Sequence, residues 1–123
     1  MNFFQRRRIL KRLNVLEATP VRVCAHEPGE ADLISVVVPK FRNILINQIF
    51  LQRRSKNFFI RLDRFGSATW LAIDGNKNVE AICRELEEKF GDEVRPVDER
   101  VSKFLSLLYE QRYITFKELQ HAE

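Results

Sequence analysis

The residue types that carry most enzyme chemistry are sparse in this chain of 123 residues. His26 and His121 are the histidines, and Cys24 and Cys83 are the cysteines. Their spacing matches neither a zinc site nor a disulfide framework. The chain also lacks a glycine-rich loop of the kind that holds phosphate groups. The sequence therefore predicts neither a metal ion nor a cofactor.

Three aspartates remain as candidates for acid–base catalysis. Asp63, Asp74 and Asp98 could serve if two of their carboxylates lay side by side. Each also stands at the start of an expected helix or in a turn, where a short polar side chain hydrogen bonds to the backbone. The structural role is favoured for all three, so we expect a protein that is not an enzyme.

The basic charge of the chain is concentrated at its beginning. The net charge is +4, yet Arg6, Arg7, Arg8, Lys11 and Arg12 place five cations and no acid in the first twelve residues. Of the 21 basic residues 16 then remain, against 17 acidic residues, so the rest of the chain has a net charge of −1. Nucleic-acid binding is disfavoured, because it calls for a basic face on the folded domain itself.

Composition indicates a globular and soluble protein, with 45% hydrophobic and 31% charged residues. No apolar run has the length of a membrane span, and the N-terminus lacks the apolar core and cleavage site of a signal peptide. A cytoplasmic location is the default expectation.

The first half of the chain is expected to supply a helix and then strands. Residues 2–17 have a helical pattern, with Ile9, Leu13 and Leu16 on one stripe. Residues 25–32 have the composition of a loop, and residues 33–38 that of a strand. Between residues 41 and 51 strand and helix remain open, with a strand or bulged strand preferred; a basic turn, residues 53–57, follows. Residues 58–63 alternate cleanly as a strand.

The second half is expected to be mainly helical. A short helix runs from Asp63, a plausible N-cap, toward Gly75, which suits a left-handed position. A second helix covers residues 79–90 and a third residues 98–112, with a closing strand at residues 113–117. The expected fold is α+β and winged helix-turn-helix-like: a small antiparallel sheet followed by three helices, with an extra N-terminal helix.

The stretch from Phe59 to Phe116 resembles the PqqD family, the coenzyme PQQ synthesis protein D-like domains. The resemblance lies in Leu62-Asp63, in Gly66-Ser67-Ala68-Thr69-Trp70 and in Ile73-Asp74-Gly75. It continues through Val79-Glu80-Ala81-Ile82, Leu86, Phe90-Gly91, Val101, Phe104-Leu105 and Ile114. We therefore expect a PqqD-like winged-helix domain at residues 21–123, preceded at residues 1–20 by a basic amphipathic helix or arm that the minimal family domain lacks.

This resemblance implies a non-catalytic accessory protein, also called a RiPP recognition element. Such domains bind the leader segment of a ribosomal precursor peptide and present it to a modifying enzyme, often of the radical S-adenosylmethionine class. In the family the leader adds a strand to the sheet edge beside the third helix. The residues implied here are Phe58, Phe59, Ile60, Arg61, Leu62 and Asp63.

The third helix offers a second set of candidate residues. Val97, Val101, Phe104, Leu105 and Leu108 form its expected core stripe. Leu107 lies off that stripe, on the same flank as Arg100 and Lys103, and would suit an acidic peptide that bears leucine. The alternative is that Leu107 fills the edge of the core while both cations are solvated. The candidate set thus gains Arg100, Lys103, Phe104 and Leu107.

Two other functions and several roles for the basic arm stay open. A winged-helix DNA-binding regulator shares the layout, although the acidic helix at residues 79–90 would repel phosphate. A protein–protein scaffold is the other alternative. The arm could lie on an anionic membrane, dock on a partner or on its own domain, or form a homodimer.

Overall fold

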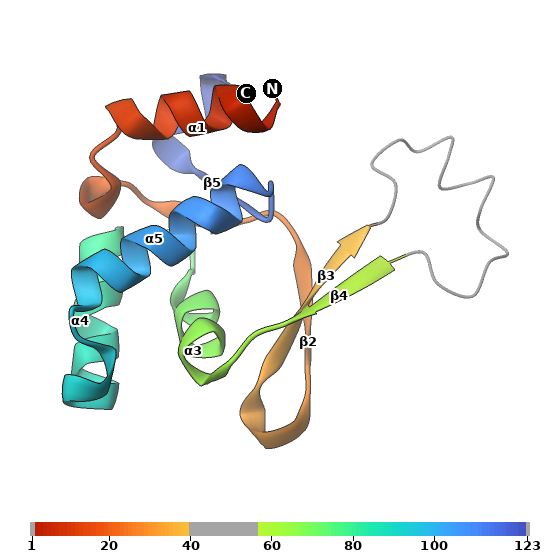
Figure 1. Ribbon diagram of the computed structural model, residues 1–123, viewed down its shortest axis with the longest axis vertical. Helices are drawn as coiled ribbons and strands as arrows, with labels where there is room; N and C mark the ends of the chain where they lie inside the picture. The colour runs from red at the N-terminus through yellow and green to blue at the C-terminus, as the bar shows by residue number, and fades with distance from the viewer. Residues whose placement is uncertain (1, 40–56, 123) are drawn as a thin grey trace, which may run out of the picture. The chain divides into compact units, whose positions relative to one another are not determined.

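The computed structural model describes residues 2–39 and 57–122 of the chain (Figure 1). The described residues fall into two compact units, of which the first comprises Met1–Val23 and Ala68–Glu123 and the second Cys24–Ser67. Each unit contains its own antiparallel sheet. The expected strand or bulged strand at residues 41–51 and most of the expected basic turn lie outside the described residues.

The first unit is mainly helical. Its longer helices are α1 (Phe3–Arg12), α4 (Val79–Phe90) and α5 (Val97–Glu110). Its two-stranded sheet pairs β1 (Pro20–Arg22) with β5 (Ile114–Phe116). Short 3-10 turns complete it: η1 (Val15–Glu17), η3 (Gly91–Val94) and η4 (Lys117–Ala122). Helix α3 (Arg64–Ala72) begins in the second unit and ends in the first.

The second unit is built around a three-stranded antiparallel sheet of order β2-β3-β4. Its strands are β2 (Ala25–Pro28), β3 (Ile34–Pro39) and β4 (Asn57–Arg61), with the short turn η2 (Glu30–Asp32) between the first two. Val36 is opposite His26 on one side and Ile60 on the other. Ile34, Val36 and Val38 are buried, so alternate residues of the central strand supply the apolar face of this sheet.

Helix α4 forms where its sequence pattern predicts it. The Asn78 side chain accepts a hydrogen bond of 2.8 Å from the Ala81 N–H at the start, and Gly91 has a φ of 62° at the end. Both features satisfy groups that a helix end leaves without partners. The buried residues of α4 are Val79, Ile82, Cys83 and Leu86, whose spacing places them on one apolar stripe of the helix.

Helix α5 follows the predicted stripe with two differences. Val97, Val101, Leu105 and Leu108 are buried, but Phe104 is only half-buried and Tyr109 is buried in addition. Tyr109 packs against Phe116 of β5, with ring centroids 5.4 Å apart. The core face of α5 therefore widens toward its C-terminal end, where the short sheet of this unit lies.

The N-terminal helix is shorter than predicted and buries a different face. It ends at Arg12, and residues 15–17 form a separate 3-10 turn. Its buried residues are Arg6 and Leu10, whereas Ile9, Leu13 and Leu16 are only half-buried. The predicted stripe was wrong because it was based on the spacing of apolar residues alone, and this spacing cannot indicate that an arginine is buried.

Two strands were missed in the sequence. Residues 25–28, expected as a loop, form β2, and residues 20–22 form β1. Charge and proline made residues 25–28 look like a loop, but both are tolerated on an edge strand. The α+β class, with small antiparallel sheets and an additional N-terminal helix, is confirmed.

Candidate functional site

The outer edge of β4 offers backbone groups for a further strand. The Leu62 N–H donates to the Ile34 carbonyl at 3.0 Å, so this pair is hydrogen bonded across the two strands. Antiparallel pairs alternate in this respect, so the backbone of Ile60 also faces β3. The N–H and C=O groups of Phe59 and Arg61 then point away from β3, toward the edge.

The opposite edge of the same sheet is less suited to pairing. The backbone of Val36 faces β4, so the backbones of its neighbours Ser35 and Val37 face β2. Within β2, the backbones of His26 and Pro28 then face outward. Pro28 has no N–H to donate, and proline is one of the devices that protect an exposed edge. Among the described residues, β4 is therefore the edge with backbone donors at its outward positions Phe59 and Arg61.

The side chains of β4 expose unusual apolar area. Phe58 and Phe59 are 54% and 52% exposed, and as neighbours along a strand they lie on opposite faces of the sheet. Arg61 is exposed on the same face as Phe59, and Ile60 is half-buried on the face of Phe58. An added strand would meet an aromatic ring on either face.

A small cavity lies at the end of β4. Its volume is about 170 Å³, and its lining includes Arg61 and Leu62 of the β4 segment together with Glu30, Leu33 and Ser35. The last three residues were not singled out from the sequence, because Glu30 falls in the expected loop at residues 25–32 and Leu33 and Ser35 fall in the expected strand at residues 33–38. Two residues of that expected loop, Ala31 and Asp32, have positive φ angles of 56° and 61°.

Two predicted site residues of the same stretch, Leu62 and Asp63, contribute to the fold. Leu62 is 8% exposed. Asp63 is the N-cap of α3: its carboxylate accepts from the Gly66 N–H at 2.7 Å. Beside it, Ser67 Oγ accepts from the Ile34 N–H at 3.0 Å and donates to the Leu62 carbonyl at 3.3 Å. These contacts fix the end of β4 against the start of α3.

The candidate residues of α5 lie in the first unit. Leu107 is 50% exposed, and Lys103, one turn earlier, is also exposed. Arg100 is exposed too, and its Nη1 donates to the Glu93 carbonyl at 2.7 Å. Leu107 is thus not buried at the edge of the core, and it remains available for contact.

The acidic residues considered for catalysis make structural contacts. The Asp74 carboxylate accepts from Asn76 N–H at 2.8 Å and Lys77 N–H at 3.0 Å. The Asn76 N–H in particular lowers the pKa of Asp74. Asp98 pairs with Arg84. In the part of the chain that the structure describes, no three acidic, cysteine or histidine side chains could hold a metal ion together.

Cys83 has the character of a core residue. It is fully buried on α4, and its Sγ lies 4.0 Å from the Val97 carbonyl oxygen. Burial, together with the nearby Asp98 carboxylate, raises the pKa of the Cys83 thiol to about 12. A thiol that stays protonated is a poor nucleophile and a poor metal ligand.

Arg6 is the residue whose importance the sequence concealed. It is only 6% exposed, its Nε donates to the Tyr109 carbonyl at 2.7 Å, and its Nη2 donates to the Ile114 carbonyl at 3.2 Å. Its guanidinium carbon also lies 3.8 Å from the centre of the Tyr109 ring. Arg6 therefore attaches α1 to the end of α5, and only four of the five N-terminal cations are on the surface.

Residues 48–114 match the family described as coenzyme PQQ synthesis protein D (PqqD). The match covers more than half of the chain. The chain belongs to the PqqD family. No curated protein and no solved structure matches it. The family match includes β4, α3, α4 and α5, whereas α1 precedes it. None of the helices within the described residues has the length and apolar character to cross a membrane.

Proposed function

We propose that this PqqD-family protein is a non-catalytic accessory protein that binds a precursor peptide and presents it to a modifying enzyme. Support comes from the family assignment, whose description names PQQ synthesis, and from the outward-facing backbone of β4. The binding mode we propose is strand addition at β4.

The outward-facing backbone of Phe59 and Arg61 is the observation that carries this proposal. An added strand gains its affinity from main-chain hydrogen bonds and its selectivity from the side chains that alternate across the sheet. On one face the peptide would contact Phe58 and Ile60, and on the other Phe59 and Arg61. The cavity lined by Arg61 and Leu62 would receive one peptide side chain.

The charge of these surfaces suggests the chemistry of the peptide. Arg61 stands on the β4 edge, and Lys103 stands beside Leu107 on α5. An acidic peptide with apolar residues at alternate positions would complement each surface separately. We further propose, from the family resemblance, that the modifying enzyme is of the radical S-adenosylmethionine class.

Hydrogen exchange tests the strand addition residue by residue. The probes are synthetic peptides for the short reading frames that neighbour this gene, titrated into the full chain. We expect the amides of Phe59 and Arg61 to gain protection, because they point away from β3, while that of Ile60 changes little because β3 already protects it. Uniform protection along β4, or none, would contradict this binding mode.

A matched pair of alanine variants separates peptide binding from folding. Phe59→Ala should weaken peptide binding by about 1–2 kcal/mol, because an aromatic contact is lost, and should change the free energy of unfolding by less than about 0.5 kcal/mol. Leu71→Ala is the control, because Leu71 is 50% exposed and lies on α3, away from the β4 edge in sequence. Equal losses in both variants would contradict the site.

A further inference from the structure

The face of α1 that is turned away from its buried residues carries an exposed aromatic ring and three cations. Arg8 stands four residues after Phe4, and Lys11 and Arg12 stand three and four residues after Arg8, so all four share one side of the helix. All four are exposed, Phe4 to 69%. Within residues 2–39 and 57–122 none of these three cations forms an ion pair.

The opposite side of α1 is fixed to the first unit. Arg6 and Leu10 are buried there, and the Arg6 guanidinium donates to the carbonyls of Tyr109 and Ile114. Helix α1 lies along α5 in Figure 1, in agreement with their packing contacts. The helix is therefore not a loose arm, and its outer face is presented in one orientation.

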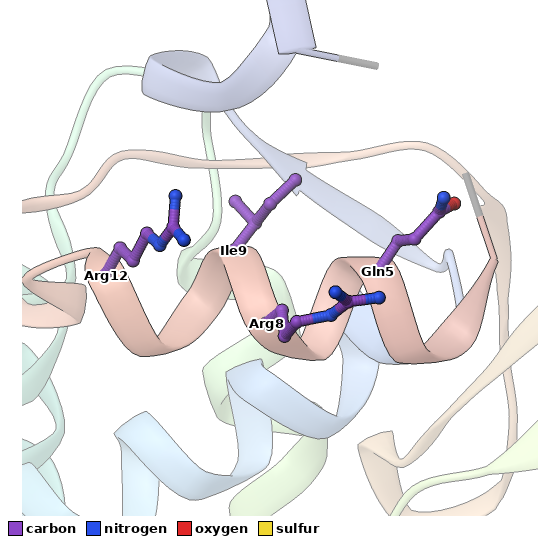
Figure 2. Close-up of a pocket in the computed structure, with 4 residues that line it drawn as sticks. All are labelled: Gln5, Arg8, Ile9 and Arg12. Carbon is purple, nitrogen blue, oxygen red and sulfur yellow. The ribbon is translucent and has the colours of Figure 1, made fainter.

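A hollow of about 300 Å³ lies on the same helix. Gln5, Arg8, Ile9 and Arg12 line it, and Figure 2 shows these side chains leaving α1 along adjacent turns. Ile9 provides an apolar, half-buried wall, and the two guanidinium groups stand on either side of it in the sequence. A guanidinium group matches the paired oxygens of a phosphate.

We propose that α1 is a docking helix for an anionic phospholipid membrane surface. Because the aromatic ring and the cations lie on one side of a helix of 10 residues, a flat surface can contact them all at once. Phe4 would enter the head-group region, and Arg8 and Arg12 would bind lipid phosphates around the hollow. Attachment would be reversible, because a single short helix supplies it.

Charge distribution favours a membrane over a nucleic acid as the binding surface. Outside the first twelve residues the chain has a net charge of −1, so the excess of positive charge comes from the segment that contains α1. An extended nucleic acid would also meet the exposed acids of α4, Glu80, Glu85 and Glu88, more readily than a plane touching one helix would. Helix α1 precedes the PqqD match at residues 48–114, so membrane docking would be a property of this chain rather than of the matched segment.

Vesicle flotation of the full chain tests this proposal. The probes are vesicles of phosphatidylcholine alone and of phosphatidylcholine mixed with phosphatidylglycerol. We expect binding to the mixed vesicles only. The triple variant Arg8→Gln/Lys11→Gln/Arg12→Gln should lose binding by roughly fivefold for each cation removed, in total about a hundredfold. Phe4→Ala should lose binding while unfolding at the same temperature as the parent chain.

A second triple variant controls for general electrostatic attraction. Lys89→Gln/Arg95→Gln/Lys117→Gln removes the same charge from exposed positions elsewhere and should keep vesicle binding within about twofold, because these cations lie off α1. Absence of binding to the mixed vesicles would overturn the proposal. Equal losses of binding in the two triple variants would also overturn it. So would tighter binding of the full chain to an oligonucleotide than to the mixed vesicles.

Discussion

At the scale of single residues, Arg6 decides where α1 lies. A buried arginine must have its donors satisfied, and here backbone carbonyls at the end of α5 and beyond accept from it. The Tyr109 carbonyl, which also accepts from the Arg112 N–H, lies in the last turn of α5, where a cation interacts favourably with the helix dipole. The Arg6 side chain thus holds α1 to two backbone carbonyls that lie 103 and 108 positions later in the sequence.

Replacing Arg6 tests this attachment. Arg6→Ala should lower the free energy of unfolding by about 2–3 kcal/mol, since charged hydrogen bonds to buried carbonyls are lost. Arg6→Lys should restore little, because an ammonium group cannot reproduce the two-carbonyl geometry or the stacking on Tyr109. Urea unfolding followed by the fluorescence of buried Trp70 measures the effect.

Arg8→Ala is the matched control for the Arg6 variants. Arg8 is exposed on the same helix, and its loss should change the free energy of unfolding by less than about 0.5 kcal/mol. If the Arg6 and Arg8 variants were equally stable, the Arg6 contacts would have no role in holding α1.

Cys83 gives a prediction about pH. Burial raises the pKa of its thiol from 9.0 to about 12, so the folded chain holds this proton more tightly than the unfolded chain does. The resulting stability is complete below pH 9 and is lost as the pH rises toward 12. Urea unfolding across this range should show a steeper decline for the parent chain than for Cys83→Ala; parallel curves would contradict it.

At the scale of elements, α5 serves two surfaces at once. Its buried stripe, from Val97 to Leu108, packs in the first unit, while Lys103 and Leu107 remain exposed on another side. The cap residues of the neighbouring helices restrict movement at the helix ends, because Asn78 and Asp63 each accept a backbone N–H. The helices thus present these exposed side chains on a stable framework.

Charge reversal on α5 tests its part in peptide binding. Lys103→Glu should weaken the binding of an acidic peptide by about 1–2 kcal/mol and leave the melting temperature unchanged, because the side chain is exposed. Lys89→Glu on α4 is the control, with the same charge change at another exposed position. A proven peptide ligand that binds the Lys103 variant with unaltered affinity would exclude this surface.

At the scale of the whole molecule, the N-terminal residues are part of the first unit rather than an appendage to it. The Ala18 carbonyl accepts from Val79 N–H at 2.9 Å at the start of α4. Thr19 exchanges contacts with the C-terminal segment: its N–H donates to the Glu118 carboxylate and its carbonyl accepts from Lys117 N–H. Residues that precede the family match therefore complete the packing of the helices within it.

Truncation tests this integration. A chain that begins at Leu13 lacks Arg6 and the buried Leu10, and it should lose about 4–6 kcal/mol of stability, from the hydrogen bonds and the apolar burial together. A chain that begins at Phe3 is the control, because it retains both residues and should stay within about 1 kcal/mol of the parent. Equal stability of the two chains would show that α1 is a loose arm.

Periodicity and end signals in the sequence determined the α+β class, helices α4 and α5, strand β3 and the cap at Asp63, because each depends on neighbouring residues alone. Strands β1 and β2 were not foreseen, because a three- or four-residue strand is defined by its partner. The burial of Arg6 depends on carbonyls from distant parts of the chain, and the outward direction of Phe59 and Arg61 depends on the pairing of β3 with β4. Only the tertiary structure could decide these, because non-local contacts are not encoded in local patterns.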